Sequence, residues 1–418
     1  MKVLFLSQRV PFPPDRGDRI TTYHFLRHFL EQGASIRIGA LSEEARDAKS
    51  VEALRGMVDS VCAPSIHPLR QRLLSLRGLL TGAPLTQTYF HHPELARTVD
   101  AWVQEDPPDV VYVYSSSMAQ YVAHHPQLFR FMQFAELDSD KWRQFAAVRR
   151  GPAAWIYRRE FARLLEFERD VARSFAACAV VSEVEKKLFM EHIPDVTPLV
   201  LPNGVDVDHF QTAGDEARNP HTVIFTGVMN YEPNVKGVLW FADTCWPAIR
   251  QRVPDATFLI VGSHATEKIL DLGRHEGIQV LGRVPEIPPY MDQAAVAVAP
   301  LKLARGVQNK VLEAMATALP VVASSQAAQG LGPVGSDTLV LADHEDDVVA
   351  AIVDLLEDPQ RARRIGENAA AFVREHFRWE NQYEPFDRLL AKKLSEPTDA
   401  RRVTSTPTIN EAGTRPGP

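Results

Sequence analysis

The chain has 418 residues, of which 45% are hydrophobic, and this length is typical of two or three globular domains. Its formal net charge of -7 argues against a general nucleic-acid binder. The first apolar run stops at Ser7, too early for a signal peptide, and no apolar stretch reaches the roughly 20 residues that span a bilayer. The three cysteines are far apart and show no metal-ligand spacing, so we expect a cytoplasmic protein with reduced thiols and no metal site.

Short apolar strands alternate with amphipathic helical segments along the first half of the chain. Helical patterns occupy residues 19–31 and 157–174. Near-continuous apolar strands separated by helices are typical of a parallel sheet that is covered on both faces. The expected strands are 2–6, 35–40, 58–62, 109–113, 129–133 and 177–181.

The same alternation restarts after a turn-rich stretch, 202–220, so the sequence predicts an α/β fold with two doubly wound domains in tandem. The last helical region breaks near Arg378 and precedes a tail rich in Thr, Pro, Ser and Gly. The second set of expected strands is 222–226, 257–261, 278–281, 296–299, 320–323 and 338–341. The expected parts are domains at 1–202 and 203–378, a helix at 379–395 that returns to the first domain, and a disordered tail at 396–418.

Two segments of the first domain could carry chemistry. The loop 7–18 follows the first strand and holds several prolines and Gly17, and such loops face the ligand crevice of open α/β sheets. Three carboxylates, Glu136, Asp138 and Asp140, follow a later strand. They could act as a general base or bind hydroxyls, or they could cap the next helix, and we expect at least one of them to be a cap.

The second domain has glycines where strands end. Gly227 and Gly262 would let a ligand approach the backbone, and Lys236 could reach a diphosphate or simply be solvated. Arg283 follows a third glycine and could contact a base or solvent. A Gly-x-Gly-x-x-Gly fingerprint is absent after the first strand of either domain, which disfavours a dinucleotide site.

Residues 306–323 are the most informative segment, because they predict a loop, a helix, a turn and a buried strand. Gly306 permits a sharp bend, and Lys310 and Glu313 share one face of the helix. Open N–H groups at a helix start, together with the Lys310 ammonium, suit a phosphate. The Glu313 carboxylate suits sugar hydroxyls, so this segment predicts a nucleotide site.

Two basic amphipathic stretches, 67–80 and 157–165, have two interpretations. Such helices can lie on an anionic membrane surface, which would make the protein a peripheral partner of the membrane. They can also be ordinary helices that turn an apolar side to the core and a charged side to solvent.

Three blocks taken together resemble the GT-B glycosyltransferases and, within them, the large retaining family four. They are residues 201–210 (Leu-Pro-Asn-Gly-Val-Asp-Val-Asp-His-Phe), 225–227 with Lys236-Gly237, and 312–316 with 320–323. The resemblance covers residues 1 to 395. Residues 138–142 and 304–316 are similar to the sugar transferase subgroup associated with bacterial exopolysaccharide and exosortase gene clusters.

The resemblance implies two Rossmann-like domains that face a central cleft, a nucleotide-sugar donor as substrate, no cofactor and no metal. Glu313 would bind the ribose, Lys236 and the helix start at 306–310 would hold the diphosphate, and Gly17 would lie near the phosphates. The expected donor-binding residues are Gly17, Gly227, Lys236, Gly262, Arg283, Arg305, Gly306, Val307, Gln308, Asn309, Lys310 and Glu313.

Two positions depart from the family pattern. Arg305 stands where the first glutamate of a Glu-x7-Glu pattern is common, and Val228 stands where an arginine often follows the glycine at 227. Phosphate binding would then be shared among Lys236, Arg305 and Lys310. An arginine can pair with a phosphate through its planar fork.

The resemblance therefore implies a metal-independent, retaining hexosyltransferase of bacterial exopolysaccharide synthesis. It would transfer a sugar to a glycan or polyprenyl-linked acceptor, in the cytoplasm and with possible contact to the inner face of the membrane. The donor's β-phosphate would deprotonate the acceptor, with Glu136, Asp138 or Asp140 as helpers. The alternatives are a nucleotide-sugar epimerase, a non-catalytic glycan-binding or scaffold protein, and, least favoured, a dinucleotide oxidoreductase.

Overall fold

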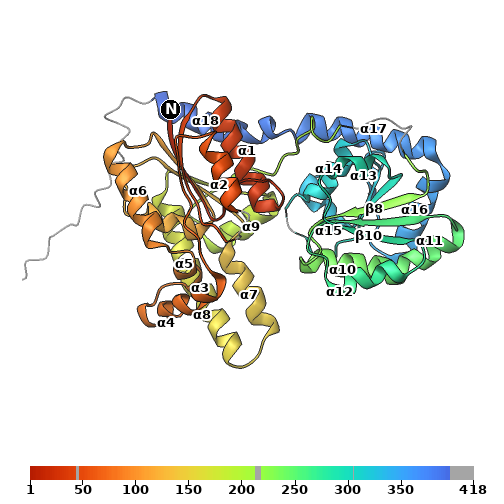
Figure 1. Ribbon diagram of the computed structural model, residues 1–418, viewed down its shortest axis with the longest axis horizontal. Helices are drawn as coiled ribbons and strands as arrows, with labels where there is room; N and C mark the ends of the chain where they lie inside the picture. The colour runs from red at the N-terminus through yellow and green to blue at the C-terminus, as the bar shows by residue number, and fades with distance from the viewer. Residues whose placement is uncertain (44–46, 212–217, 305, 396–418) are drawn as a thin grey trace, which may run out of the picture. The chain divides into compact units, whose positions relative to one another are not determined.

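The computed structural model describes residues 1–43, 47–211, 218–304 and 306–395, and in them two parallel sheets are covered by helices (Figure 1). Within these ranges the chain divides into two compact units. Residues 1–13, 25–178 and 388–395 form the first unit, and residues 14–24 and 179–387 form the second. Arg305 and the predicted disordered tail lie outside the described residues.

The first sheet has seven strands in the order β3-β2-β1-β4-β5-β6-β7. The chain first adds strands on one side of β1 and then crosses back to add β4 on the other side. The strand order therefore reverses between β1 and β4, where open α/β sheets bind ligands. The strands are β1 (Lys2–Ser7), β2 (Ser35–Gly39), β3 (Ser60–Cys62), β4 (Val110–Tyr114), β5 (Arg130–Ala135), β6 (Ala177–Val180) and β7 (Leu199–Val200).

Helices cover both faces of this sheet because its strands are apolar on both sides, and all five residues of β4 are buried. On one face, Phe29 of α1 meets Phe5 edge-on at 6.4 Å, and Phe5 stacks on Tyr112 at 4.8 Å. The helices of this half are α1 (Gly17–Glu31), α2 (Asp47–Arg55), α3 (Pro68–Ser75), α4 (Arg77–Thr81), α5 (Leu85–Tyr89), α6 (Pro93–Glu105), the 3-10 helix η1 (Ser116–Tyr121), α7 (Asp138–Val148), α8 (Pro152–Ser174) and α9 (Glu183–His192).

The second sheet has six strands in the order β10-β9-β8-β11-β12-β13, so its order reverses between β8 and β11. In Figure 1, α10 and α12 lie on one side of this sheet, and α14 and α17 lie on the other. The strands are β8 (Thr222–Thr226), β9 (Thr257–Val261), β10 (Ile278–Gly282), β11 (Val296–Ala299), β12 (Val321–Ala323) and β13 (Val340–Leu341).

The expected break near Arg378 is confirmed, because α17 ends at His376 and α18 begins at Trp379. The Asn203-Gly204 turn packs against the chain at this break. A Cβ on Gly204 would lie 2.8 Å from backbone atoms of Trp379, so only glycine fits at this approach. The helices of this half are α10 (Glu232–Trp240), α11 (Trp246–Arg252), α12 (Glu267–Asp271), α13 (Pro288–Asp292), α14 (Asn309–Ala316), α15 (Ser325–Ala328), α16 (Glu345–Glu357), α17 (Pro359–His376) and α18 (Trp379–Ser395).

All twelve expected strands are present, with small differences at their ends. β3 begins at Ser60 instead of residue 58, because the Asp59 carboxylate turns back to accept the backbone N–H of Ile36 at 2.7 Å. The two-residue strand β7 was not predicted, because it is too short to carry a pattern. No helix in the described ranges is long and apolar enough to cross a bilayer.

Candidate functional site

The second sheet ends its first three strands in glycines with positive φ. Gly227, Gly262 and Gly282 follow or end β8, β9 and β10, with φ of 152°, 155° and 68°. A Cβ on Gly262 would lie 1.6 Å from the Gly227 carbonyl oxygen. Two backbones therefore touch at the carboxyl edge of the sheet, and the side chains of Asn234 and Lys310 lie next to Gly227.

The loop before α14 is held by a similar contact. Gly306 has a φ of 61°, and a Cβ on Gly330 would lie 2.5 Å from the Gly306 carbonyl and from the Val307 nitrogen. Gln308 occupies the cap position of α14 without a side-chain cap bond. The helix is anchored through a buried face, so its first N–H groups lie at a fixed place next to β11. The buried residues of α14 are Val311, Leu312, Ala314, Met315 and Ala316.

Lys310 is the centre of the site in the second unit. Its ammonium donates a hydrogen bond to Asn234 Oδ1 at 2.6 Å and lies 5.1 Å from the centre of the Phe225 ring. Asn234 is buried in α10, and its amide donates to the Val228 carbonyl at 2.9 Å. An ammonium has three N–H donors, and Asn234 accepts one of them. We call Gly227, Asn234, Lys310 and Glu313 the lysine cluster.

Burial shifts the charges of this cluster toward neutrality. Burial lowers the pKa of Lys310 to about 8, against an opposing effect of Glu313. Burial raises the pKa of Glu313 to about 7, against an opposing effect of Lys310. Both side chains are half-buried, so each keeps a face from which a ligand can be reached. A bound anion would favour the charged form of Lys310. Ligand hydroxyl groups that donate hydrogen bonds to Glu313 would favour its carboxylate form.

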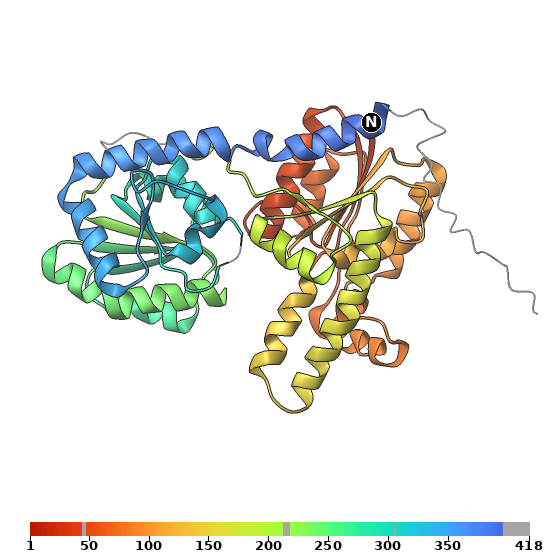
Figure 2. The same cartoon turned by 180° about the vertical axis from the view of Figure 1, so that it is seen from behind.

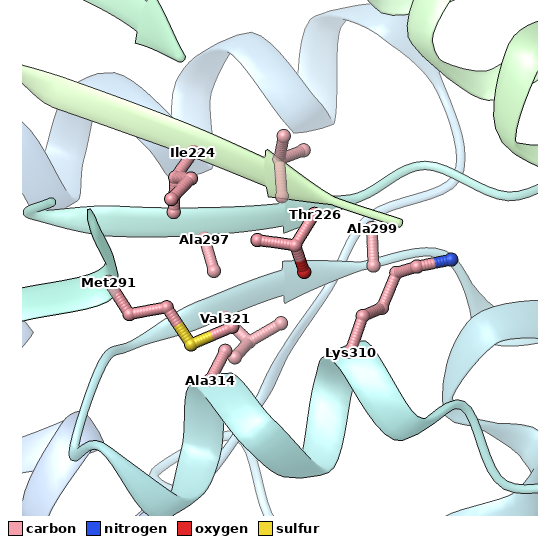
Figure 3. Close-up of a pocket in the computed structure, with 9 residues that line it drawn as sticks. Ile224, Thr226, Met291, Ala297, Ala299, Lys310, Ala314 and Val321 are labelled. Atoms are coloured by element: carbon pink, nitrogen blue, oxygen red, sulfur yellow. The ribbon is translucent and has the colours of Figure 1, made fainter. Parts of the chain in front are cut away.

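A small cavity lies below this cluster, between the sheet and α14. Its volume of about 10 Å³ is at the lower limit for one water molecule, so it is a packing gap. Figure 3 shows the Lys310 stem beside this gap and its nitrogen pointing away from it, beyond the strand ends. The lining residues are Ile224, Thr226, Met291, Ala297, Val298, Ala299, Lys310, Ala314 and Val321.

The structure does not bring Lys236 into the lysine cluster. Its ammonium pairs with Glu232 at 2.7 Å, and both side chains are exposed. The helix α10 begins at Glu232, so Lys236 is its fifth residue, one turn from its start. Asn234, two positions earlier, takes the inward position instead, because residues two apart lie on different faces of a helix.

The other predicted donor residues occupy varied positions. Arg283 is exposed after β10, and no atom lies within 4 Å of where a Cβ on Gly17 would be, at the start of α1. Val307 is buried. Asn309 accepts a hydrogen bond from Asn203 at 3.1 Å, which ties the Asn203-Gly204 turn to the start of α14. Arg305 lies outside the described residues.

The first sheet has a different polar group at its own reversal point. Asp138 accepts hydrogen bonds from the Ser115 hydroxyl at 3.3 Å and from the Ser116 hydroxyl at 3.1 Å. The Gln8 amide, just after β1, donates to Ser115 at 3.3 Å. Glu168 of α8 accepts the backbone N–H of Ser139 at 3.4 Å and is fully buried. We call Gln8, Ser115, Ser116, Asp138 and Glu168 the serine–acid cluster.

The three predicted carboxylates have separate environments, and the expectation that one of them caps α7 is wrong. Leu137 occupies the cap position, and the helix begins at Asp138. Asp140 is buried and binds Arg143 and Gln144, each at 2.6 Å, within its own helix. Glu136 is exposed. Of the three, Asp138 alone enters the serine–acid cluster.

Backbone strain and burial mark this cluster. Ser115 and Ala135 end or follow β4 and β5 with φ of 73° and 62°, which is unusual for residues other than glycine and typical of functional sites. Burial raises the pKa of Asp138, and burial followed by the charge of Asp138 raises the pKa of Glu168 to about 8. This part of the site is therefore suited to holding and exchanging a proton.

Several of these residues were not predicted from the sequence, namely Gln8, Ser115, Ser116, Glu168, Asn234 and Gly330. Asn234 and Ser115 are of types that are common in any loop or helix. Glu168 lies among buried leucines and valines of α8, and an acid at such a position is a signal that could have been used. Gly330 makes its contact only through the folded chain.

Three further side chains meet elsewhere in the first unit. His124 Nε2 and His125 Nε2 lie 2.7 Å and 2.9 Å from the same Asp100 oxygen, and these atoms could together hold a metal ion. The sequence spacing did not indicate this group, because Asp100 is 24 residues from His124.

One family model and two curated relatives each match part of the chain. Residues 220–358 match the family model described as Glycosyl transferases group 1, which is about a third of the chain and contains the whole lysine cluster. An uncharacterized 44.6 kDa protein in the cps region of Klebsiella pneumoniae is 23% identical over 229 residues, which are 52% of this chain. A GDP-mannose-dependent alpha-(1-6)-phosphatidylinositol monomannoside mannosyltransferase of Mycolicibacterium smegmatis is 29% identical over 172 residues, which are 38% of this chain.

The chain spans about half the length of these curated relatives, 59% of the first and 44% of the second. Solved structures match over a greater length. The sucrose-phosphate synthase of Thermosynechococcus elongatus has a TM-score of 0.68 and 15% identity over 94% of this chain and 99% of its own. HepE of Anabaena, solved in complex with UDP-glucose, has a TM-score of 0.66 and 17% identity over 94% of this chain and 100% of its own.

At these identities the structural matches establish the fold and nothing further. The two parallel α/β domains predicted from the sequence are confirmed as the GT-B architecture. The chain thus has a GT-B fold, and its residues 220–358 match the Glycosyl transferases group 1 model.

Proposed function

We propose that the chain is a glycosyltransferase that moves a hexose from a nucleotide-sugar donor to a hydroxyl of a glycan or a polyprenyl-linked acceptor. The observation that carries the proposal is the lysine cluster. A half-buried ammonium, held by Asn234, lies one turn from the Glu313 carboxylate at the reversal point of the second sheet. This cluster also lies within the segment that matches the family.

The donor would bind with its diphosphate on Lys310 and on the N–H groups of residues 307–309. These groups supply the positive charge that a leaving diphosphate needs, so the proposal includes no metal and no cofactor. Glu313 would accept the ribose hydroxyls, and Gly227 and Gly262 would allow close approach. HepE binds UDP-glucose and the mycobacterial relative uses GDP-mannose, so both uridine and guanosine donors are candidates here. Contributions of Gly17, Lys236, Arg283 and Arg305 remain predictions.

The acceptor would bind at the serine–acid cluster. Hydroxyl groups of Ser115 and Ser116 and the Asp138 carboxylate can exchange hydrogen bonds with a sugar hydroxyl. The donor β-phosphate, assisted by Asp138, would take the acceptor proton, with retention at the anomeric carbon. The cps-region relative supports a place in polysaccharide synthesis, and we propose the cytoplasm as its location.

Isothermal titration calorimetry with UDP, GDP and ADP, and with hexose forms of those that bind, tests the donor site. We expect one nucleotide to bind, and we expect Glu313→Ala to weaken it about 100-fold, because two charge-assisted hydrogen bonds are lost. Lys310→Ala should weaken it similarly. Glu267→Ala and Lys268→Ala change exposed residues of the same unit and should leave the affinity unchanged.

Two outcomes would replace the proposal. Binding of none of the nucleotides would favour a non-catalytic glycan-binding or scaffold protein. Conversion of the donor sugar in the absence of any acceptor, followed by NMR, would favour a nucleotide-sugar epimerase. Product NMR with an accepted sugar would also show whether the anomeric configuration is retained.

A further inference from the structure

One helical segment of the first unit is built with its apolar side facing outward. In α3, in α4 and at the single residue between them, the exposed positions include Leu69, Leu73, Leu76 and Leu80, with exposed fractions of 64%, 70%, 49% and 91%. Their spacing of four, three and four residues makes a single stripe along the helices. We call these four residues the leucine face.

The opposite side of the same helices is buried and polar or small. Gln71, Ser75 and Gly78 are the buried positions, again four and three residues apart. Gly78 fits tightly, because a Cβ there would lie 2.8 Å from the Ala83 carbonyl. A helix on a water-soluble protein normally turns its leucines to the core. The second interpretation of residues 67–80, an ordinary core-facing helix, is therefore wrong.

The neighbouring α7–α8 hairpin has a similar surface at its tip. Val148 and Trp155 are 78% and 60% exposed, on either side of the turn between the two helices. Figures 1 and 2 both show this hairpin projecting from the first unit beside α3 and α4. The two parts are tied together, because Arg159 of α8 donates hydrogen bonds to the carbonyls of Gly78 at 2.5 Å and Ala83 at 3.3 Å.

The stretch that contains α3 and α4 and the tip of the α7–α8 hairpin are basic and lack acids. Residues 65–93 contain no Asp or Glu, and neither do residues 141–159. This one-sided charge is local, since the whole chain has a net charge of -7. The exposed basic residues of the two segments include Arg70, Arg72, Arg77, Lys141, Arg149, Arg150 and Arg158.

We propose that the leucine face and the tip of the α7–α8 hairpin form a docking surface for an anionic lipid bilayer. Leucines and a tryptophan would enter the boundary between headgroups and acyl chains, and the arginines would meet the negatively charged headgroups. Charge complementarity favours a membrane over a second copy of this chain, because two copies of one basic face repel each other.

The inference goes beyond glycosyl transfer, because lipid binding requires no nucleotide and can fail or succeed independently. If the acceptor is polyprenyl-linked, the same surface would keep the first unit at the membrane where such an acceptor resides. This link between the docking surface and the acceptor rests on the proposed function.

Co-sedimentation of the full chain with vesicles tests the docking surface. We expect binding to phosphatidylcholine vesicles that contain phosphatidylglycerol, little binding to phosphatidylcholine alone, and release at high salt. The triple variant Leu69→Gln, Leu73→Gln, Leu80→Gln should lower the partition coefficient by roughly 100-fold. Replacing Arg70, Arg72 and Arg77 by Gln should also lower it roughly 100-fold, at about fivefold for each arginine.

A matched control replaces three exposed leucines of the second unit, Leu270, Leu281 and Leu341, whose exposed fractions are 53%, 39% and 54%. It should bind like the wild type. Because all substituted leucines are exposed, both triple variants should keep the melting temperature of the wild type. Bound wild type should also show a blue shift of tryptophan fluorescence that Trp155→Phe reduces.

The proposal is overturned if the wild type ignores anionic vesicles, or if the leucine-face variant binds them as tightly as the control does. It is also overturned if sedimentation velocity shows a dimer that the leucine-face variant abolishes while vesicles remain unbound. That result would assign the face to a second copy of the chain.

Discussion

The two sheets share one topology at their reversal points but end their strands in different residues. In the second sheet, positive φ at the strand ends is carried by Gly227, Gly262 and Gly282. In the first sheet it is carried by Ser115 and Ala135. Glycine adopts this conformation without cost, whereas a serine or alanine is strained by roughly 1–3 kcal/mol.

The difference indicates what each edge is built to contact. The glycines at 227 and 262 let two backbones touch next to a cation at Lys310, and this combination suits the phosphates of a donor. The first sheet accepts strain to place hydroxyls beside Asp138 and Glu168, and this combination suits an alcohol and its proton. The glycines lie at β8, β9 and β10, on one side of the reversal point of the second sheet, whereas Ser115 and Ala135 lie at β4 and β5, on the other side of the reversal point of the first. One fold thus supports two kinds of site through strand ends on opposite sides of the reversal point.

The largest expected effect is that of Gly262→Ala. The new methyl group would lie 1.6 Å from the Gly227 carbonyl at a φ of 155°, so two backbones must separate. We expect a loss of at least about 4 kcal/mol of stability, measured as a lowered unfolding midpoint in denaturant. Nucleotide binding should be lost with it.

The matched change is Gly17→Ala, where no atom lies within 4 Å of the new methyl group. Because Gly17 begins a helix, alanine should leave stability unchanged or raise it by less than about 1 kcal/mol. Equal changes in stability for Gly262→Ala and Gly17→Ala would contradict the view that the second sheet depends on the backbone contact between Gly227 and Gly262.

Much of the fold could be predicted from the sequence, because each strand is a short apolar run between helical patterns. The expected strands at 222–226 and 257–261 agree with β8 and β9 at both ends. The exceptions have local causes. Asp59 shortened β3 by using its side chain on a neighbouring strand, and β7 has two residues.

The site could be predicted less well, because its geometry depends on contacts between distant residues. Lys310 and Glu313 were recognised from their helical spacing, and they lie on one helix as expected. Asn234, 76 residues from Lys310, has no sequence feature that marks it as the partner. The family resemblance pointed to Lys236, whereas the structure pairs its ammonium with Glu232.

Asp138→Asn tests whether the serine–acid cluster takes part in the reaction. Asparagine keeps an oxygen for the Ser115 and Ser116 hydroxyls but cannot accept a proton. We expect kcat to fall about 100-fold, with donor affinity unchanged in calorimetry. A loss of donor affinity would show that the two clusters are not divided between acceptor and donor.

Asp140→Asn is the companion change. Asp140 binds Arg143 and Gln144 within its own helix, so its loss should lower stability and leave kcat nearly unchanged. A greater fall in kcat for Asp140→Asn than for Asp138→Asn would move the catalytic assignment from one carboxylate to the other.

The smallest expected effect is the dependence of stability on pH through Glu168. Burial and the neighbouring Asp138 raise the pKa of Glu168 from 4.5 to about 8 in the folded protein. Between these values the folded chain holds a proton that the unfolded chain has released, so the stability of the wild type falls as pH rises through this window. Glu168→Gln removes the titration and keeps an oxygen for the Ser139 N–H.

The variant should therefore match the wild type near pH 5 and melt at least about 3 °C higher near pH 8.5, a difference that corresponds to about 1 kcal/mol or more. Glu166→Gln on the same helix is the control, because Glu166 is exposed, is paired with Arg163 and lies outside the serine–acid cluster. A gap between wild type and Glu168→Gln that stays constant with pH would mean that Glu168 is already ionised in the fold. The serine–acid cluster would then carry two negative charges. The two clusters would differ in the sign of the charge that each offers a ligand, and not in the ability to exchange a proton.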